Sequence, residues 1–202
     1  MDNKQGLETL QDIRNIMERS SKFVGLSGWS GTAAGASALA GAWAARKTIV
    51  AHDIAAGDID LGRKLIIIGI LTFVAAFVSA FLFTLIRSKK NNIPIFGNTA
   101  RNFLFNIMVP MSAGGILILK MTLTGHIGLI APATLIVYGI SLFCAGRITL
   151  IEIRYLGYAE IVSGIVSLWN IGCGLYFWAF GFGILHIVFG FVIWFKYERV
   201  NR

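Results

Sequence analysis

The chain of 202 residues is 56% hydrophobic and only 14% charged, with a mean hydropathy of +0.72. Ordinary soluble domains carry about 25% charged residues, so the composition excludes that class and indicates a protein that lies mostly in lipid. The formal net charge of +8 does not indicate nucleic-acid binding, because the 18 Lys and Arg residues stand in short clusters between apolar stretches and not along one helical face.

An amphipathic segment precedes the apolar stretches. Between Leu7 and Ser20, apolar residues recur at helical spacing opposite a face on which acids and bases balance. A helix that lies on lipid usually has a basic polar face, so this pattern fits docking against the cytoplasmic side of the protein as well as interfacial anchoring. Binding of a partner protein is the alternative. We therefore expect a cytoplasmic amphipathic helix over residues 1–22.

Six apolar stretches that can serve as spans of a hydrocarbon core about 30 Å thick come next. The last two are separated only by a cluster of glycines, which offers a turn near Phe177. The sequence thus predicts an all-α fold, a polytopic transmembrane helix bundle over residues 23–197 with a short cytoplasmic tail at 198–202. The expected spans are residues 23–45, 65–86, 103–119, 127–146, 158–176 and 180–195.

The basic residues predict the orientation of this bundle. With six spans, thirteen Lys and Arg residues lie on the side of both termini and five lie on the opposite side. By the positive-inside rule both termini are cytoplasmic. The absence of N-x-Ser/Thr acceptor sites favours a bacterial membrane over one of the secretory pathway, so we expect a plasma membrane, the bacterial inner membrane.

Small residues form one face of the first span. Gly28, Gly31, Gly35 and Gly41 recur at spacings of three, four and six residues, interspersed with Ala and Ser. Small side chains let a neighbouring backbone approach closely, which is the usual basis of helix association in lipid. We therefore interpret these glycines as helix-packing residues at the centre of the bundle.

The same span contains the tetrapeptides 25–28 and 28–31, both of the form G-x-S-G. They resemble the motif of rhomboid intramembrane serine proteases, and His186 followed by Gly190 is loosely similar to the histidine-bearing last helix of that family. The resemblance covers about a dozen residues and implies Ser27 or Ser30 as a nucleophile activated by His186. The second span lacks the His and Asn that the family places there.

Polar residues gather on one face of the fifth span. Glu160, Ser163, Ser167 and Asn170 follow each other at steps of three and four, and polar side chains within a span usually face the bundle interior. With a turn near Phe177, Asn170 and the His186 of the sixth span would lie about 10 and 13 Å from that turn. We therefore expect Asn170 and His186 to pair, either as a structural hydrogen bond or as a proton-relay or ligand-binding site.

Glu160 carries two interpretations. Paired with Arg147 or Arg154 it would be a structural ion pair, whereas without a partner it becomes a candidate for proton coupling.

Signals for other chemistry are weak. Of the three histidines, His52 and His126 fall in predicted loops, so no pair is available for haem, and we expect no cofactor and no metal site. Cys144 and Cys173 are expected to be small packing residues.

The sequence thus favours a non-enzymatic role as a small transporter or channel-like protein with a polar site between spans five and six. The alternative is a membrane module that binds lipid or a partner membrane protein, including a second copy. An intramembrane serine hydrolase is the more distant alternative.

Overall fold

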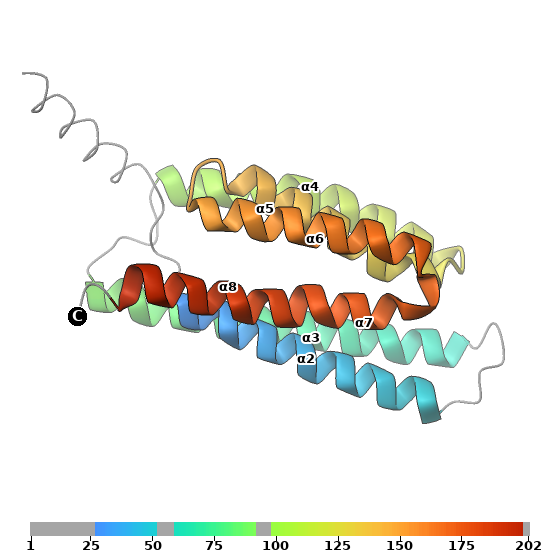
Figure 1. Ribbon diagram of the computed structural model, residues 1–202. Coiled ribbons are helices and arrows are strands. Elements are labelled where there is room, and N and C mark those ends of the chain that lie inside the picture. Colours follow the sequence, from blue (N-terminus) through green and yellow to red (C-terminus); the bar gives the residue numbers. More distant parts are fainter. Residues whose placement is uncertain (1–26, 52–58, 92–97, 200–202) are drawn as a thin grey trace, which may run out of the picture.

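The computed structural model describes residues 27–51, 59–91 and 98–199, and every regular element in these ranges is helical (Figure 1). The amphipathic helix expected over residues 1–22, and all but two residues of the expected tail at 198–202, lie outside the described residues. The long helices before the last one are α2 (Gly28–Ala51), α3 (Ile59–Asn91), α4 (Asn98–Leu123), α5 (Ile130–Ala145), which follows the short η1 (Ile127–Leu129), and α6 (Ile151–Trp169).

The remaining chain forms one long helix, residues 171–198, which we call the C-terminal helix. Its hydrogen-bonding pattern changes along its length, and its two π segments have a wider turn than an α-helix. Its consecutive parts are η2 (Ile171–Cys173), α7 (Gly174–Trp178), the π segment η3 (Ala179–Leu185), α8 (His186–Ile193) and the π segment η4 (Trp194–Glu198).

Four helices are long and apolar enough to cross a membrane. They are residues 61–90, 100–123, 127–145 and 171–198, so the chain has the character of a membrane protein, but the expected six spans are not confirmed. The two other long helices are less apolar for identifiable reasons. Helix α6 carries Glu152, Arg154 and Glu160, and α2 is rich in Gly, Ala and Ser.

The helices lie side by side in two groups (Figure 1). Helices α4, α5 and α6 form one group, while α2, α3 and the C-terminal helix form the other. The C-terminal helix packs along α2 and also contacts α6, so it joins the two groups. The starts of α2 and α4 and the end of the C-terminal helix lie at the same end of the bundle, which we call the basic end.

Glycines bring α2 against the C-terminal helix. Gly28, Gly31 and Gly35 face this helix so closely that a Cβ built on Gly28 would lie 2.5 Å from the carbonyl oxygen of Gly190. Gly41 instead faces α3. Contacts of this kind need glycine, because any side chain would force the two backbones apart.

The turn before the C-terminal helix lies earlier than the sequence predicts. Helix α6 ends at Trp169, and the chain turns at Asn170, directly before η2 begins the C-terminal helix, not near Phe177. The glycines Gly181 and Gly183 are within the helix, where they face Glu160 and Leu39 of neighbouring helices. Glycine occurs both in turns and where two helices pack closely. Gly181 and Gly183 have the second role, so the prediction of a turn at these glycines is wrong.

Candidate functional site

Glu160 of α6 is the most unusual side chain among the described residues. Its exposed fraction is 0%, it faces Gly181 of the C-terminal helix, and neither carboxyl oxygen has a hydrogen-bond partner in the part of the chain that the structure describes. The nearest basic group is His186, whose Nδ1 lies 3.4 Å from Glu160 Oε1. An acid without partners in an apolar interior is costly, so such a residue is expected to have a function.

Tyr138 of α5 completes the cluster around the imidazole. Its hydroxyl lies 2.9 Å from His186 Nε2, and the carbonyl oxygen of Gly181 lies 3.1 Å from His186 Nδ1. A carbonyl oxygen can only accept, so Nδ1 carries a hydrogen and donates it to Gly181 O. In the neutral imidazole, Nε2 therefore accepts from the Tyr138 hydroxyl, and a second proton on the ring would reverse that hydrogen bond.

Aromatic rings enclose this cluster on one side. The rings of Tyr138 and Phe182 stack on His186, with centroids 5.4 and 6.0 Å away, and Trp178 lies against Phe182 at 5.0 Å. These contacts hold the imidazole in one orientation and keep bulk water from its faces.

The π segment η3 shapes the approach of the carboxyl group. Gly181 lies in this segment, and a Cβ at this position would collide with Glu160 Oε2 and with the side chain of Leu135. Glycine therefore makes room for the carboxyl against the backbone of the C-terminal helix. Segments of π-helix occur frequently at functional sites, and this one ends at the residue before His186.

Two serines continue the polar face of α6. Ser163 is buried and donates its hydroxyl to Ala159 O at 2.8 Å. Ser167 has an exposed fraction of 0%, and its Oγ has no partner among the described residues. Glu160, Ser163 and Ser167 thus lie on one face of α6, and their polar atoms point into the protein.

The expected pairing of Asn170 with His186 is wrong. Asn170 is exposed at the C-terminal cap of α6, where its side-chain amide donates to Val166 O at 3.1 Å. Because the turn lies at Asn170 itself, Glu160, about 15 Å further along α6, takes the position opposite His186.

Neither arginine considered as a partner reaches Glu160. Arg147 is exposed in the connection between α5 and α6, and the Arg154 guanidinium lies 5.4 Å from the ring of Phe143. The interpretation of Glu160 as half of an Arg ion pair is therefore wrong, and the interpretation without such a partner remains. Tyr138 was missed because a tyrosine in a span resembles the aromatic residues found at membrane interfaces.

The two serines at the start of α2, Ser27 and Ser30, do not bond a histidine. Ser30 donates to Ser27 O at 2.5 Å, and the Ser27 hydroxyl donates to Glu198 Oε1 at 3.3 Å. The imidazole of His186 is engaged with Tyr138 instead. Neither Ser27 nor Ser30 bonds a histidine among the described residues, so this geometry gives no support to the resemblance to rhomboid proteases.

Carboxylates tie the basic end together. Glu198 Oε1 accepts from the backbone N–H of Gly28 at 2.6 Å and from Arg87 Nη1 at 2.7 Å, which links the C-terminal helix to α2 and α3. Glu152 of α6 accepts from Lys196 Nζ at 2.5 Å and from the Tyr197 hydroxyl at 3.1 Å. Both helix groups are thus bonded to the last turns of the C-terminal helix.

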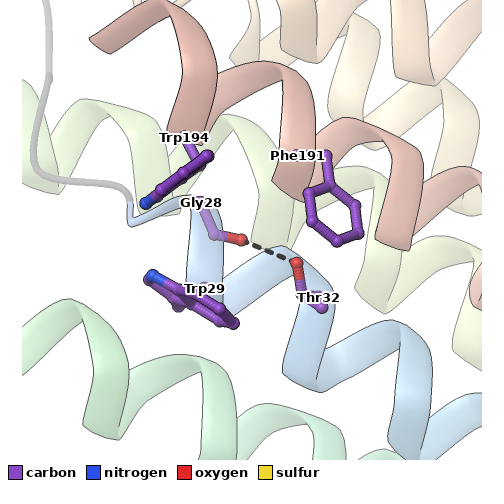
Figure 2. Close-up of a pocket in the computed structure, with 5 residues that line it drawn as sticks. All are labelled: Gly28, Trp29, Thr32, Phe191 and Trp194. Carbon is purple, nitrogen blue, oxygen red and sulfur yellow. Dashed lines mark hydrogen bonds between the residues drawn. The ribbon is translucent and has the colours of Figure 1, made fainter. Parts of the chain in front are cut away.

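A small apolar pocket lies beside the start of α2. Figure 2 shows Trp29 and Trp194 with Phe191 around it, while the hydroxyl of Thr32 is turned to Gly28 O. Its volume of about 70 Å³ is well below the roughly 300–1,000 Å³ of small-molecule sites. The Thr32 hydroxyl is bonded to the backbone and no polar atom faces the pocket to fix a ligand, so it is a weaker candidate than the cluster around Glu160.

Among the described residues, no three His, Cys, Asp or Glu side chains lie close enough to hold a metal ion. Comparisons of the chain with protein-family models, with curated proteins and with solved structures each found no match. The function proposed for this protein therefore rests on the chemistry of its site.

Proposed function

We propose that this protein is a small proton-coupled membrane transporter in which Glu160 and His186 bind the proton. The observation that carries the proposal is the Glu160 carboxyl, which has an exposed fraction of 0%, no hydrogen-bond partner among the described residues, and His186 at 3.4 Å. Ionisable residues inside membrane proteins commonly belong to proton relays and ion pathways.

A purely structural ion pair would have a different environment. Buried ion pairs are favourable only when further hydrogen bonds satisfy the remaining lone pairs. Neither oxygen of Glu160 has such a bond among the described residues. Position 181 is a glycine, and any side chain there would collide with the carboxyl. This arrangement lowers stability if Glu160 is only structural, whereas it suits a group that gains and loses a proton.

One proton shared by Glu160 and His186 keeps the pair neutral. It can be on the acid beside a neutral imidazole, or on Nε2 of the ring beside a carboxylate, in which case Nε2 donates to the Tyr138 hydroxyl, because Nδ1 already carries its own hydrogen. Loss of this proton leaves a negative charge between α6 and the C-terminal helix, and a second proton leaves a positive one. Each change disfavours the packed interface, so proton binding and release can drive these two helices between arrangements.

In this proposal the transported species is the proton itself or a substrate that moves together with the proton. In this proposal α2 and α6 also cross the membrane, because their small and polar faces are covered by neighbouring helices. The greater number of basic residues at the basic end supports a cytoplasmic position for that end, in a bacterial inner membrane. The described ones there are Arg87, Lys89, Lys90, Arg101, Arg147, Arg154, Lys196 and Arg199.

Proton flux into liposomes tests the proposal. Purified protein is reconstituted with a pH-sensitive dye inside, and a potassium gradient with valinomycin provides the driving force. We expect flux above that of empty liposomes, and its loss in Glu160→Gln. The control is Asn106→Leu, which removes an exposed polar group of α4 that bonds only its own helix, to Asn102 O at 2.8 Å.

Infrared difference spectra give a second readout without transport. The C=O stretch of a protonated carboxylic acid should appear in the wild-type protein as the pH changes and should be missing in Glu160→Gln. A wild-type protein with neither this signal nor flux above empty liposomes would contradict the proposal.

Lipid binding is the second candidate function, and the pocket between Trp29 and Trp194 favours it. The pocket is apolar and Trp29 is 49% exposed, so part of one acyl chain is the occupant that fits. Phospholipids brominated at different acyl positions would test it. Quenching of Trp194 in a protein without the other tryptophans should exceed quenching of Trp43, which is 62% exposed outside the pocket.

A further inference from the structure

We propose that the proton reaches Glu160 from the end of the bundle opposite the basic end, along Ser167 and Ser163. This inference rests on the proposed function and adds the route and the residues that form it. It follows from the difference between the two directions that lead away from Glu160 along α6.

Toward the basic end, apolar side chains close the route. Leu156 and Ile153 of α6 pack with Ile193 of the C-terminal helix and with Leu142 of α5 in one buried cluster. The exposed fractions of Ile153 and Ile193 are 2% and 0%. Tightly packed apolar side chains exclude water, and constrictions of this kind serve as gates in channels.

Beyond this apolar cluster, the contact of Glu152 with Lys196 and Tyr197 holds the two helices together at the basic end. Glu152 is bonded to a cation and a hydroxyl, whereas the carboxyl of Glu160 has no hydrogen-bond partner among the described residues. It closes the interface and offers no unpaired group that could pass a proton to Glu160.

Toward the opposite end, hydroxyl groups follow Glu160 on the same face. Ser163 and Ser167 lie about 4.5 and 10.5 Å beyond Glu160 along the helix axis. The Ser167 Oγ is fully buried without a partner among the described residues, which leaves it able both to donate and to accept. The exposed turn at Asn170 follows one helical turn later.

Each hydroxyl can accept one proton and release another, so its own protonation state is the same before and after the transfer. A hydronium ion at the turn gives a proton to the next oxygen in the row and is left as water, the hydroxyl there turns and releases its own proton onward, and the last transfer puts the proton on a Glu160 oxygen. The bond broken at each step is an O–H of the donor, and the bond formed is an O–H of the acceptor. Single waters can bridge the gaps between the hydroxyls.

Among the described residues, two titratable side chains of the packed helices lie around Glu160, and the buried Leu135 of α5 lies beside it at Gly181. Tyr138 comes from α5, and His186 comes from the C-terminal helix. Tyr138 also packs against the apolar cluster, but its hydroxyl is bonded to His186, so a proton arriving along the serines reaches Glu160 first and then meets His186 and Tyr138.

Cysteine accessibility tests the route. In a background with Cys144→Ala and Cys173→Ala, Ser167→Cys and Ile193→Cys are exposed to a small, membrane-impermeant thiol reagent from each side of oriented vesicles. We expect Ser167→Cys to react from the side of the Asn170 turn and Ile193→Cys to react from neither side. Reaction of Ser167→Cys only from the basic end, or of Ile193→Cys but not of Ser167→Cys, would overturn the route.

Flux through variants gives the second measurement. Ser167→Leu fills the route and should lower proton flux about tenfold or more, whereas Ser167→Ala leaves room for a water and should cost only a few-fold. Ile193→Ser should raise the flux by opening the apolar cluster. Circular dichroism identifies any variant that has not folded, in which case Ser167→Ala and Ile193→Ser decide.

The two proposals fail in different ways. If wild-type protein shows the carboxylic-acid signal and proton flux, but Ser167→Leu carries wild-type flux, the route is wrong and the proposed function stands. If wild-type protein shows neither signal nor flux, the proposed function fails as well.

Discussion

Replacement of Gly190 by alanine should separate α2 from the C-terminal helix. A Cβ at this position would lie 2.5 Å from Gly28 O and 2.6 Å from the Thr32 backbone nitrogen, where ordinary contacts begin at 3.4 Å. The shortfall is about 0.9 Å. The Thr32 hydroxyl also lies in the way and can rotate, but Gly28 O and the Thr32 nitrogen are backbone atoms, so no side-chain rotation relieves the collision with them. Overpacking of a close interface costs about 1–3 kcal/mol, so Gly190→Ala should lower the free energy of unfolding by that amount.

The matched control is Gly115→Ala in α4. A Cβ there meets nothing within 4 Å, so only helix propensity changes, which favours alanine by about 0.8–1.0 kcal/mol. Unfolding of both variants in mixed micelles, followed by circular dichroism, gives the two free energies. If Gly190→Ala were as stable as Gly115→Ala, the close contact of α2 with the C-terminal helix would be refuted.

Three further changes probe the site and the basic end. Tyr138→Phe removes the hydroxyl that bonds His186 and should cost about 1 kcal/mol in unfolding free energy, with an altered imidazole signal in the NMR spectrum; an unaltered signal would place the ring elsewhere. Glu198→Gln weakens the bond to the N–H of Gly28 and should cost about 1–2 kcal/mol in the same unfolding assay, less in high salt, and a salt-independent loss would speak against an ionic contact. A fluorophosphonate should label neither the wild-type protein nor Ser30→Ala, because the Ser30 hydroxyl is bonded to Ser27 O and not to a histidine. Labelling of the wild-type protein that is lost in Ser30→Ala would support the hydrolase interpretation.

Much of the helical architecture follows from the sequence, because long apolar stretches and small-residue faces are strong patterns in lipid. The polar face of α6 is also visible there, since Glu160, Ser163 and Ser167 recur at helical spacing. The partners of Glu160 are not, because they depend on the position of one turn. Moving that turn from Phe177 to Asn170 changed which residue lies opposite the histidine.

Other features could not be read from the pattern. The π segment η3 depends on tertiary contacts and has no sequence signature of its own. Tyr138 joins the cluster only because α5 packs beside both α6 and the C-terminal helix. Glu198 and Gly28 are 170 positions apart in the sequence, and no local pattern predicts the hydrogen bond between them.

That last contact bears on the order in which the chain is assembled. The backbone N–H of Gly28 begins α2, but the carboxylate that binds it is synthesised 170 residues later. At about 5–20 residues per second, the ribosome needs roughly 10–30 s to cover this distance. Throughout that time the start of α2 and its glycine face wait without their partner, while α2 and α3 can already pair. The native arrangement can therefore close only after the C-terminal helix has left the ribosome.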